Sequence, residues 1–202
     1  YETVQIGYQL WMAENLKTTH YNNGDEIPTG YSDEEWYNLS TGGYGVYPTD
    51  DSWSQATCGD NCSEVYGNLY NWYTVDDNRG VCPENWHVPT DEEFMELEIE
   101  LGMSEEDAYS YGSNRGTDEG SKLAGNSELW LYGDVVNNPE FGTSGFNALP
   151  AGNRNCCQNS YDYIVNRADF WLREDVDGSG SAVMREIHAA NTIVSRFFFE
   201  KK

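Results

Sequence analysis

The clearest periodic pattern of apolar and polar positions lies in the stretch "HVPTDEEFMELEIELGM". Phe94, Leu97 and Leu101 recur at the i, i+3, i+7 spacing that places side chains on one face of a helix. Thr90 is a good N-cap, and the glutamate three residues later completes a capping box. The pattern therefore predicts a helix over residues 91–101 with one buried face.

Three shorter stretches predict further elements around this helix. "SDEEWYNL" repeats the capping pattern on a smaller scale, and "QLWMAENL" has the apolar density of a buried segment. "YGNLYNWYTV" fits a short helix or strand in which Leu69, Trp72 and Tyr73 are buried. The rest is rich in Gly, Asn and Asp, with short strand-like pieces and no repeat or linker, which predicts a single, loop-rich α+β domain. The tryptophans expected to be mostly buried in its core are Trp11, Trp72, Trp86 and Trp171.

The C-terminal stretch "IVSRFFFEKK" allows two interpretations. In a strand, Phe197 and Phe199 share one face and Phe198 takes the other. Either the strand is buried on both sides, or at least one large ring is displayed to a partner. Exposed aromatic rings usually mark an interaction site, which favours display of at least one of the three.

Acidic charge is concentrated in the first three quarters of the chain. The net charge is -24; residues 1–152 hold 28 acidic and 4 basic side chains, whereas residues 153–202 hold 7 of each. Such a surface disfavours nucleic acids and anionic membranes as partners, and no apolar run is long enough for direct membrane insertion. The acidity serves either solubility or binding, and composition alone does not decide between them.

Five cysteines leave an odd thiol. Cys58 and Cys62 can close a small disulfide loop, whereas the adjacent Cys156 and Cys157 would form a strained ring with each other. Those two are expected to be free thiols, or one of them pairs elsewhere. There is no pair of CxxC motifs with nearby histidines, so the spacing does not predict zinc.

The stretch "DVDGSGSAVMRE" has the spacing of a calcium-binding EF-hand loop. Asp175, Asp177 and Ser179 stand at positions 1, 3 and 5, a glycine at 6 and Glu186 at 12. Against this interpretation, Ala182 replaces the usual β-branched residue at position 8, and no second loop follows. Calcium is therefore a candidate cofactor, and the alternative is a Gly-Ser turn with solvated acids.

No motif predicts catalysis. His20, His87 and His188 are scattered, and His87 beside Trp86 is expected to be a packed structural residue. A nucleophile elbow, a phosphate loop and a metalloprotease helix are all missing from the sequence. Paired carboxylates suited to glycoside hydrolysis arise by chance in so acidic a chain. The prediction is a protein that is not an enzyme.

Six phrases in fixed order resemble one known family. They are "VQIGYQLWMAENLKTTHYNNGDEIP", "YGNLYNWYTV", "CPENWHVPTDEEFMELE", "GSKLAGNSELW", "GFNALPAGNR" and "ADFW". Together they resemble the Fibrobacter succinogenes major paralogous domain over nearly the whole chain. The resemblance implies a C-type lectin-like fold, also found in formylglycine-generating enzymes and in variable proteins of diversity-generating retroelements. It also implies a bacterial protein that is secreted or displayed at the cell surface, often lipid-anchored, with no established catalytic activity. The first residue, Tyr1, is then expected to begin a processed or excised form.

The chain departs from the family pattern in two places. Relatives continue into a strand of the form Gly-Phe-Ser-Val-Arg-Cys, which is expected to lie beyond Lys202 and whose cysteine would give Cys82 a partner. After "GFNALPAG" the sequence departs from the family pattern, except at a few anchor positions that keep the family residue. The retained anchors are Gly152, Arg154, Ala168, Phe170 and Trp171.

This irregularity resembles retroelement diversification. Adenine-directed mutagenesis of Asn-type codons yields a restricted set of residues, and twelve of the residues between Asn153 and Asn166 belong to it. Ordinary drift in a loop-rich family is the alternative. The hypothesis treats residues 1–152 as a scaffold and residues 153–202 as a variable region that binds an unknown protein or glycan. Tyr161, Tyr163, Ile193, Ser195 and at least one phenylalanine of the tail are expected on one contiguous exposed face. The predicted ligand-binding residues are Asn153, Asn155, Tyr161, Asp162, Tyr163, Ile164, Ile193, Ser195, Phe197, Phe198 and Phe199.

Two other functions remain open. A formylglycine-generating type of oxidase would need a suitably placed pair of reactive cysteines, and nothing near Cys156 and Cys157 would activate either thiol. A carbohydrate-binding or structural surface module would use the aromatic rings to stack on sugars.

Overall fold

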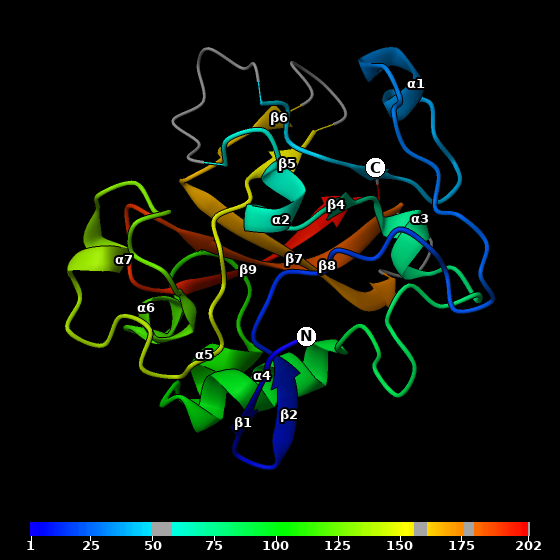
Figure 1. Ribbon diagram of the computed structural model, residues 1–202. Helices are drawn as coiled ribbons and strands as arrows, with labels where there is room; N and C mark the ends of the chain where they lie inside the picture. The colour runs from blue at the N-terminus through cyan, green and yellow to red at the C-terminus, as the bar shows by residue number, and fades with distance from the viewer. Residues whose placement is uncertain (50–57, 156–160, 176–179, 202) are drawn as a thin grey trace.

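A three-stranded antiparallel sheet forms the centre of the molecule in the computed structural model (Figure 1). Its order is β7-β8-β9, with β7 at Arg167–Asp175, β8 at Ser181–His188 and β9 at Val194–Glu200. The register aligns Trp171 with Met184 and Met184 with Phe197. The structure describes residues 1–49, 58–155, 161–175 and 180–201.

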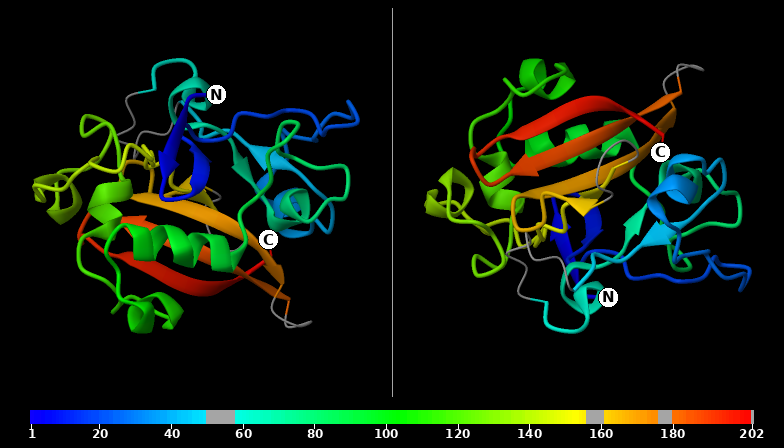
Figure 2. Two further views of the ribbon diagram at one scale, coloured as in Figure 1. Left: turned by 90° about the horizontal axis from the view of Figure 1, so that it is seen from below. Right: turned by 90° about the horizontal axis from the view of Figure 1, so that it is seen from above.

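Helix α4, Asp91–Glu100, covers one face of this sheet. Figure 2 shows α4 across the sheet in the view from below, and the opposite face of the sheet in the view from above. Its N-terminus has the predicted capping box, in which Thr90 accepts from the Glu93 amide and the Glu93 carboxylate accepts from the Thr90 amide. The predicted helix is thus confirmed, one residue shorter than expected because Leu101 is its C-cap. Phe94 and Leu97 pack into the main core.

Short elements surround the sheet and helix. A second capping box, with Ser32 and Glu35, starts α1 as predicted. The remaining strands form two-stranded pairs: β1 (Thr3–Ile6) with β2 (Gln9–Met12), β3 (Tyr44–Gly45) with β4 (Leu69–Tyr70), and β5 (Asn153–Arg154) with β6 (Tyr161–Asp162). The short helices are α1 (Asp33–Tyr37), α2 (Cys62–Tyr66), α3 (Trp72–Val75), α5 (Glu105–Tyr109), α6 (Glu119–Leu123) and α7 (Asp134–Asn137).

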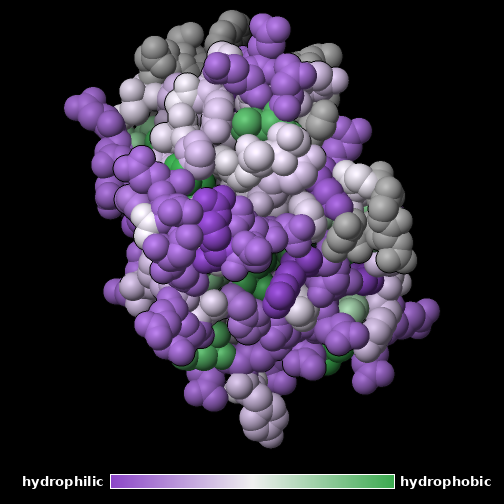
Figure 3. All heavy atoms as spheres, turned by 90° about the vertical axis from the view of Figure 1, so that its right-hand side faces the viewer, coloured by the Kyte–Doolittle hydropathy of each residue, from purple (hydrophilic) through white to green (hydrophobic). Residues whose placement is uncertain are grey.

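These elements form a small α+β domain, as the sequence predicts. Long connections between short elements account for its loop-rich character (Figure 1). None of the helices in the described ranges combines the length and apolar character that crossing a bilayer requires. Hydrophilic side chains dominate the face in Figure 3, and hydrophobic ones show mainly as small patches between them.

The burial of the predicted core tryptophans is uneven. Trp72 is buried, and its indole N–H donates to the Leu172 carbonyl. Trp11, Trp86 and Trp171 keep a minor part of their surface exposed, so the expectation of mostly buried rings is confirmed for all four tryptophans. These three rings also line a cavity, which accounts for the part of their surface that stays exposed.

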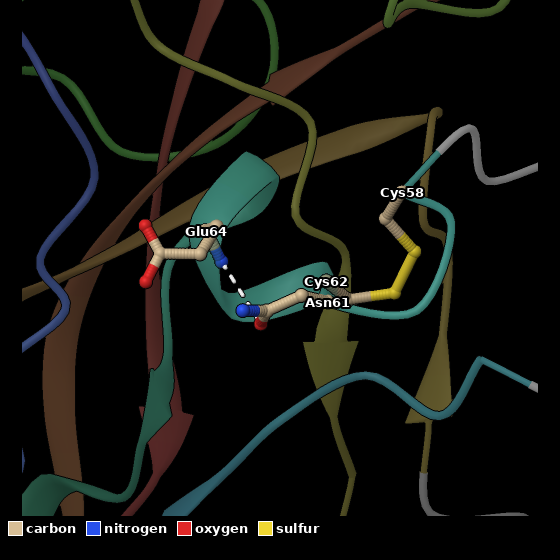
Figure 4. Close-up of a disulfide and its surroundings, with 4 residues drawn as sticks. All are labelled: Cys58, Asn61, Cys62 and Glu64. Carbon is tan, nitrogen blue, oxygen red and sulfur yellow. Dashed lines mark hydrogen bonds between the residues drawn. A yellow bond between two sulfur atoms is a disulfide. The ribbon is translucent and has the colours of Figure 1, made fainter.

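One disulfide joins Cys58 and Cys62 at the start of α2, as the short spacing allows (Figure 4). Asn61 lies between them and caps α2, because its side-chain oxygen accepts from the Glu64 amide. Cys82 is a free thiol in the described part of the chain. Cys156 and Cys157 lie outside the described residues, so their pairing stays a prediction.

Candidate functional site

The face of the sheet that points away from α4 carries the charged and aromatic side chains of the candidate site. We call it the outer face. Ala168, Phe170 and Leu172 of β7 pack in or against the main core. Because side chains alternate along a strand, the intervening residues point to the opposite side. The outer face consists of Arg167, Asp169 and Trp171 on β7, Ala182, Met184 and Glu186 on β8, and Ser195, Phe197 and Phe199 on β9.

One end of the outer face is a hydrogen-bonded charge cluster. Arg167 Nη2 lies 3.0 Å from Asp169 Oδ2 and 2.5 Å from Glu186 Oε2. Asn153 Nδ2, from the neighbouring β5, donates to Asp169 Oδ2 at 3.0 Å. With two carboxylates around one guanidinium, the ionised cluster carries a net charge of about -1.

Burial changes the acidity of this cluster. Desolvation raises the pKa of Asp169 from 3.8 to about 6, although Arg167 and the hydrogen bond from Asn153 act in the opposite direction. The Asn153 Oδ1 atom is buried and has no hydrogen-bond partner among the described residues. No described residue compensates the loss of water at this amide oxygen. A ligand that donates a hydrogen bond to it would do so.

The other end of the outer face is aromatic. Trp171 and Phe199 meet edge to face, with ring centroids 6.5 Å apart. The indole N–H of Trp171 donates to the Tyr70 carbonyl at 3.1 Å, which fixes the ring against β4. Polar cluster and aromatic pair therefore lie on one surface, brought together by the register of the sheet.

A cavity of about 610 Å³ extends from this surface past β7. Its volume falls within the range typical of small-molecule sites, about 300–1,000 Å³. Asn153, Asp169, Trp171 and Phe199 all line it. Four of the seven tryptophans of the chain also belong to its lining: Trp11, Trp36, Trp86 and Trp171.

Arg154 on β5 supports the wall of this cavity. Its guanidinium lies over the rings of Trp36, at 4.2 Å, and Tyr161, at 4.8 Å, and Nη2 donates to the Tyr31 carbonyl. Burial lowers the pKa of Arg154, and its Nε has no hydrogen-bond partner among the described residues. The stacked geometry ties the loop before α1 to β5, which explains why an arginine is suited to this anchor position.

The structure separates the predicted binding residues into exposed and buried groups. Phe198 and Phe199 are 46% and 42% exposed, so display of at least one ring is confirmed, and Tyr163 is exposed as well. Ile164 and Ser195 are buried, which is a correction: Ile164 packs with the cluster around Tyr66, and neither side chain is available to a ligand as predicted. The half-buried members are Asn153, Asn155, Tyr161, Asp162, Ile193 and Phe197.

The expectation of one contiguous exposed face is also wrong. Phe198 points to the side opposite Phe197 and Phe199 and stacks on Tyr111, with ring centroids 4.3 Å apart. Tyr161 turns inward to pack on Tyr47. Strand alternation and loop packing therefore distribute the predicted set over two sides of the sheet.

The EF-hand interpretation is contradicted as well. An EF-hand loop joins two helices, but this segment joins β7 to β8. Glu186 lies well along β8, opposite Asp169, and is paired with Arg167 rather than placed near Asp175. Asp177 and Ser179 lie outside the described residues. Within the described ranges no group of three or more His, Cys, Asp or Glu side chains could hold a metal ion.

The sequence pattern did not predict the charge cluster, although it indicated part of it. The stretch "RADFW" alternates, so Arg167, Asp169 and Trp171 were predictably on one side of a strand. The contribution of Glu186 and Asn153 depends on strand pairing and on the position of β5, which local pattern does not reveal.

Comparison with known proteins identifies the class of this small α+β domain. Residues 4–198 match the model of the Fibrobacter succinogenes major domain, and the chain belongs to that family. The matched region reaches into β9, so the strand that carries the phenylalanines is part of the family domain. No curated protein and no solved structure matches the chain.

Proposed function

We propose that this protein is a non-enzymatic ligand-binding domain of C-type lectin-like fold that acts outside the cell. The observation that carries the proposal is the outer face, where a polar cluster, an aromatic pair and a large cavity adjoin. A concave site with apolar walls and a few convergent polar groups is the usual form of a binding site. Its ligand is a protein or a glycan.

The state of the charged and sulfur groups supports binding rather than turnover. Burial raises the pKa of the Cys82 thiol to about 11, so this cavity-lining thiol stays protonated and is a poor nucleophile at neutral pH. The Glu186 carboxylate is held by Arg167. These features disfavour the formylglycine-generating type of oxidase, which requires reactive thiols.

Two further features support an extracellular location. The Cys58–Cys62 disulfide is typical of oxidising compartments. A net charge of -24 favours solubility and suppresses self-association, which suits a protein that acts outside the cell.

Retroelement diversification remains part of the proposal, restricted to residues that the fold leaves accessible. Tyr163, Phe198 and Phe199 are exposed and would tolerate exchange, whereas buried Ile164 and Ser195 would not. Sibling sequences from related loci provide the test: exchanges should concentrate at the exposed positions and spare the buried ones.

Ligand binding can be tested by probing arrays of purified glycans and purified proteins with the labelled domain. We expect reproducible binding to at least one array member, and weaker binding by Phe199→Ala. Tyr8→Ala is the matched control, because Tyr8 is a fully exposed aromatic in the turn between β1 and β2. Equal binding by wild type and Phe199→Ala to every member would contradict the proposed site.

A further inference from the structure

We infer that the ligand of the outer face is an uncharged saccharide, held by a sugar ring stacked on Trp171 and by hydroxyl groups that donate to Asn153 and Asp169. This inference rests on the proposed function and names its ligand class. It follows from what each group in the site still lacks.

Trp171 and Trp11 offer a ligand the faces of their rings and no free N–H donor. The indole N–H of Trp171 is used by the Tyr70 carbonyl, and that of Trp11 by the Gln9 side chain at 3.1 Å. Because both donors are satisfied within the chain, these rings make no further polar demand on a ligand. A ligand that matches them presents a flat face of C–H groups. The face of a pyranose ring has this character, and its hydroxyl groups lie around the rim.

The charge cluster offers a ligand acceptor oxygens, whereas the unpaired donor Arg154 Nε belongs to another part of the cavity wall. Asn153 donates to Asp169, and the Asn153 oxygen is buried with no partner among the described residues. The Asp169 and Glu186 carboxylates converge on Arg167, whose Nη2 contacts both. Ligand groups placed here must therefore donate hydrogen bonds. Saccharide hydroxyls do so without adding charge.

Charge separates a saccharide from the main alternative, a basic peptide. The ionised cluster has a net charge of about -1, but its carboxylates are already paired, and only 13% of the Asp169 side chain is exposed. An ammonium group brought to this position would be desolvated and would compete with Arg167 for the same oxygens. Neutral donors avoid that cost. The cavity of about 610 Å³ is large enough for a short oligosaccharide.

The test is isothermal titration calorimetry of the folded domain with a panel of probes. The saccharide probes are neutral tetrasaccharides of glucose, mannose, galactose, xylose and N-acetylglucosamine, and the peptide probe is tetralysine. Each titration is run at low and at high sodium chloride. We expect at least one saccharide to bind, with a dissociation constant that changes less than about twofold with salt, because no ion pair forms.

Variants then locate the binding. Trp171→Ala and Phe199→Ala should each weaken saccharide binding about tenfold or more, as expected for an aromatic hot spot. Tyr8→Ala should bind like wild type. Phe199 is partly exposed, so its variant keeps the test valid if Trp171→Ala fails to fold.

The outcomes separate the two proposals. If no saccharide binds but tetralysine does, with strong salt dependence and sensitivity to Phe199→Ala, the ligand class is wrong and the binding site stands. Saccharide binding that is unchanged in both variants overturns the inference and the proposed site together. If neither kind of probe binds, the saccharide inference is overturned, and the protein array decides on the proposed function.

Discussion

Glu98 and Arg115 form a bidentate ion pair in the interior of the protein, with both side chains fully buried. Arg115 Nη1 lies 2.7 Å from Glu98 Oε1, and Nη2 lies 2.6 Å from Oε2. Arg185 Nε also donates to Glu98 Oε1, at 2.9 Å. One carboxylate on α4 therefore bridges two guanidinium groups, one from the loop before α6 and one from the central strand β8, and Asp91 is a second counter-ion of Arg185, at 2.8 Å.

We predict that Glu98→Gln lowers the free energy of unfolding by about 3–5 kcal/mol. Removing one partner of a buried pair leaves uncompensated charge, and here two buried arginines lose their shared counter-ion. Urea denaturation measures the change. Glu92→Gln on the same helix is exposed and should stay within about 0.5 kcal/mol of wild type. A loss below about 1 kcal/mol for Glu98→Gln would show that water or rearrangement compensates the arginines.

The raised pKa of Asp169 predicts a pH dependence of stability. The folded state holds a proton up to about pH 6, whereas the unfolded carboxyl has its ordinary pKa of 3.8. Stability from this group is therefore fully present below pH 3.8 and is lost as the pH rises through 6, by about 3 kcal/mol in all. Asp169→Asn has no carboxyl to titrate at this position. The free energy of unfolding of the variant, relative to that of wild type, should therefore rise as the pH is raised from 4 to 7.

Denaturant titrations of both proteins across this pH range measure the effect. Glu128→Gln, an exposed carboxylate, is the matched control and should follow the wild-type curve. Parallel curves for wild type and Asp169→Asn would mean that the carboxyl ionises as it does in water.

The N-cap of α4 gives a local prediction. Thr90→Ala removes the hydroxyl that accepts from the Glu93 amide at 3.1 Å and should cost about 1 kcal/mol. Thr90→Ser keeps the acceptor and should cost less than about 0.5 kcal/mol. Chemical denaturation measures both, and equal losses would mean that the threonine methyl, rather than the cap, stabilises the helix.

The disulfide predicts a modest contribution to stability. Closing a loop of about five residues restricts the unfolded chain by about 2 kcal/mol in the chain-entropy treatment. Replacing Cys58 and Cys62 together by serine should lower the free energy of unfolding by that amount, measured by denaturation without reductant. As a control, adding reductant should lower the stability of wild type and leave the double variant unchanged.

The parts of the fold that sequence reasoning predicted correctly depend on neighbours along the chain. Both capping boxes and the helical stripe of Phe94 and Leu97 are local patterns, so they are readable before the structure is known. Ser195 was assigned to a binding surface because its residue type tolerates exchange, yet it is buried. Its burial depends on the position of β9 against β8 and on the surrounding loops, which composition does not encode.

The candidate site shows the same division. The sequence assigned binding residues to the last quarter of the chain, and two of them, Asn153 and Phe199, line the cavity. It missed Glu186 as a partner of Arg167 because the two are joined only by the β7–β8 register. The EF-hand interpretation is wrong for the related reason that oxygen spacing on its own does not distinguish a helix–loop–helix from a hairpin.

Phe198 and Phe199 provide the sharpest test of which side of the sheet binds. They are neighbours in sequence and similarly exposed, but they point to opposite sides. Phe199 meets Trp171 on the outer face, whereas Phe198 stacks on Tyr111, over which the Arg196 guanidinium lies at 3.9 Å. We predict that Phe198→Ala lowers the free energy of unfolding by about 0.5–1.5 kcal/mol, because it removes an aromatic pair, and leaves ligand affinity unchanged.

Phe199→Ala should show the reverse pattern. Its contact with Trp171 is looser, with ring centroids 6.5 Å apart against 4.3 Å for Phe198 and Tyr111, so its free energy of unfolding should fall by no more than about 0.5 kcal/mol, while affinity for the ligand falls by more than about 1 kcal/mol. Chemical denaturation and binding measurements on both single variants, with Tyr8→Ala as control, separate the two roles. Each phenylalanine is thus the matched control for the other, since the two substitutions remove the same atoms from adjacent positions. If Phe198→Ala weakens binding and Phe199→Ala does not, the ligand contacts the edge near Tyr111, and the outer face is not the site.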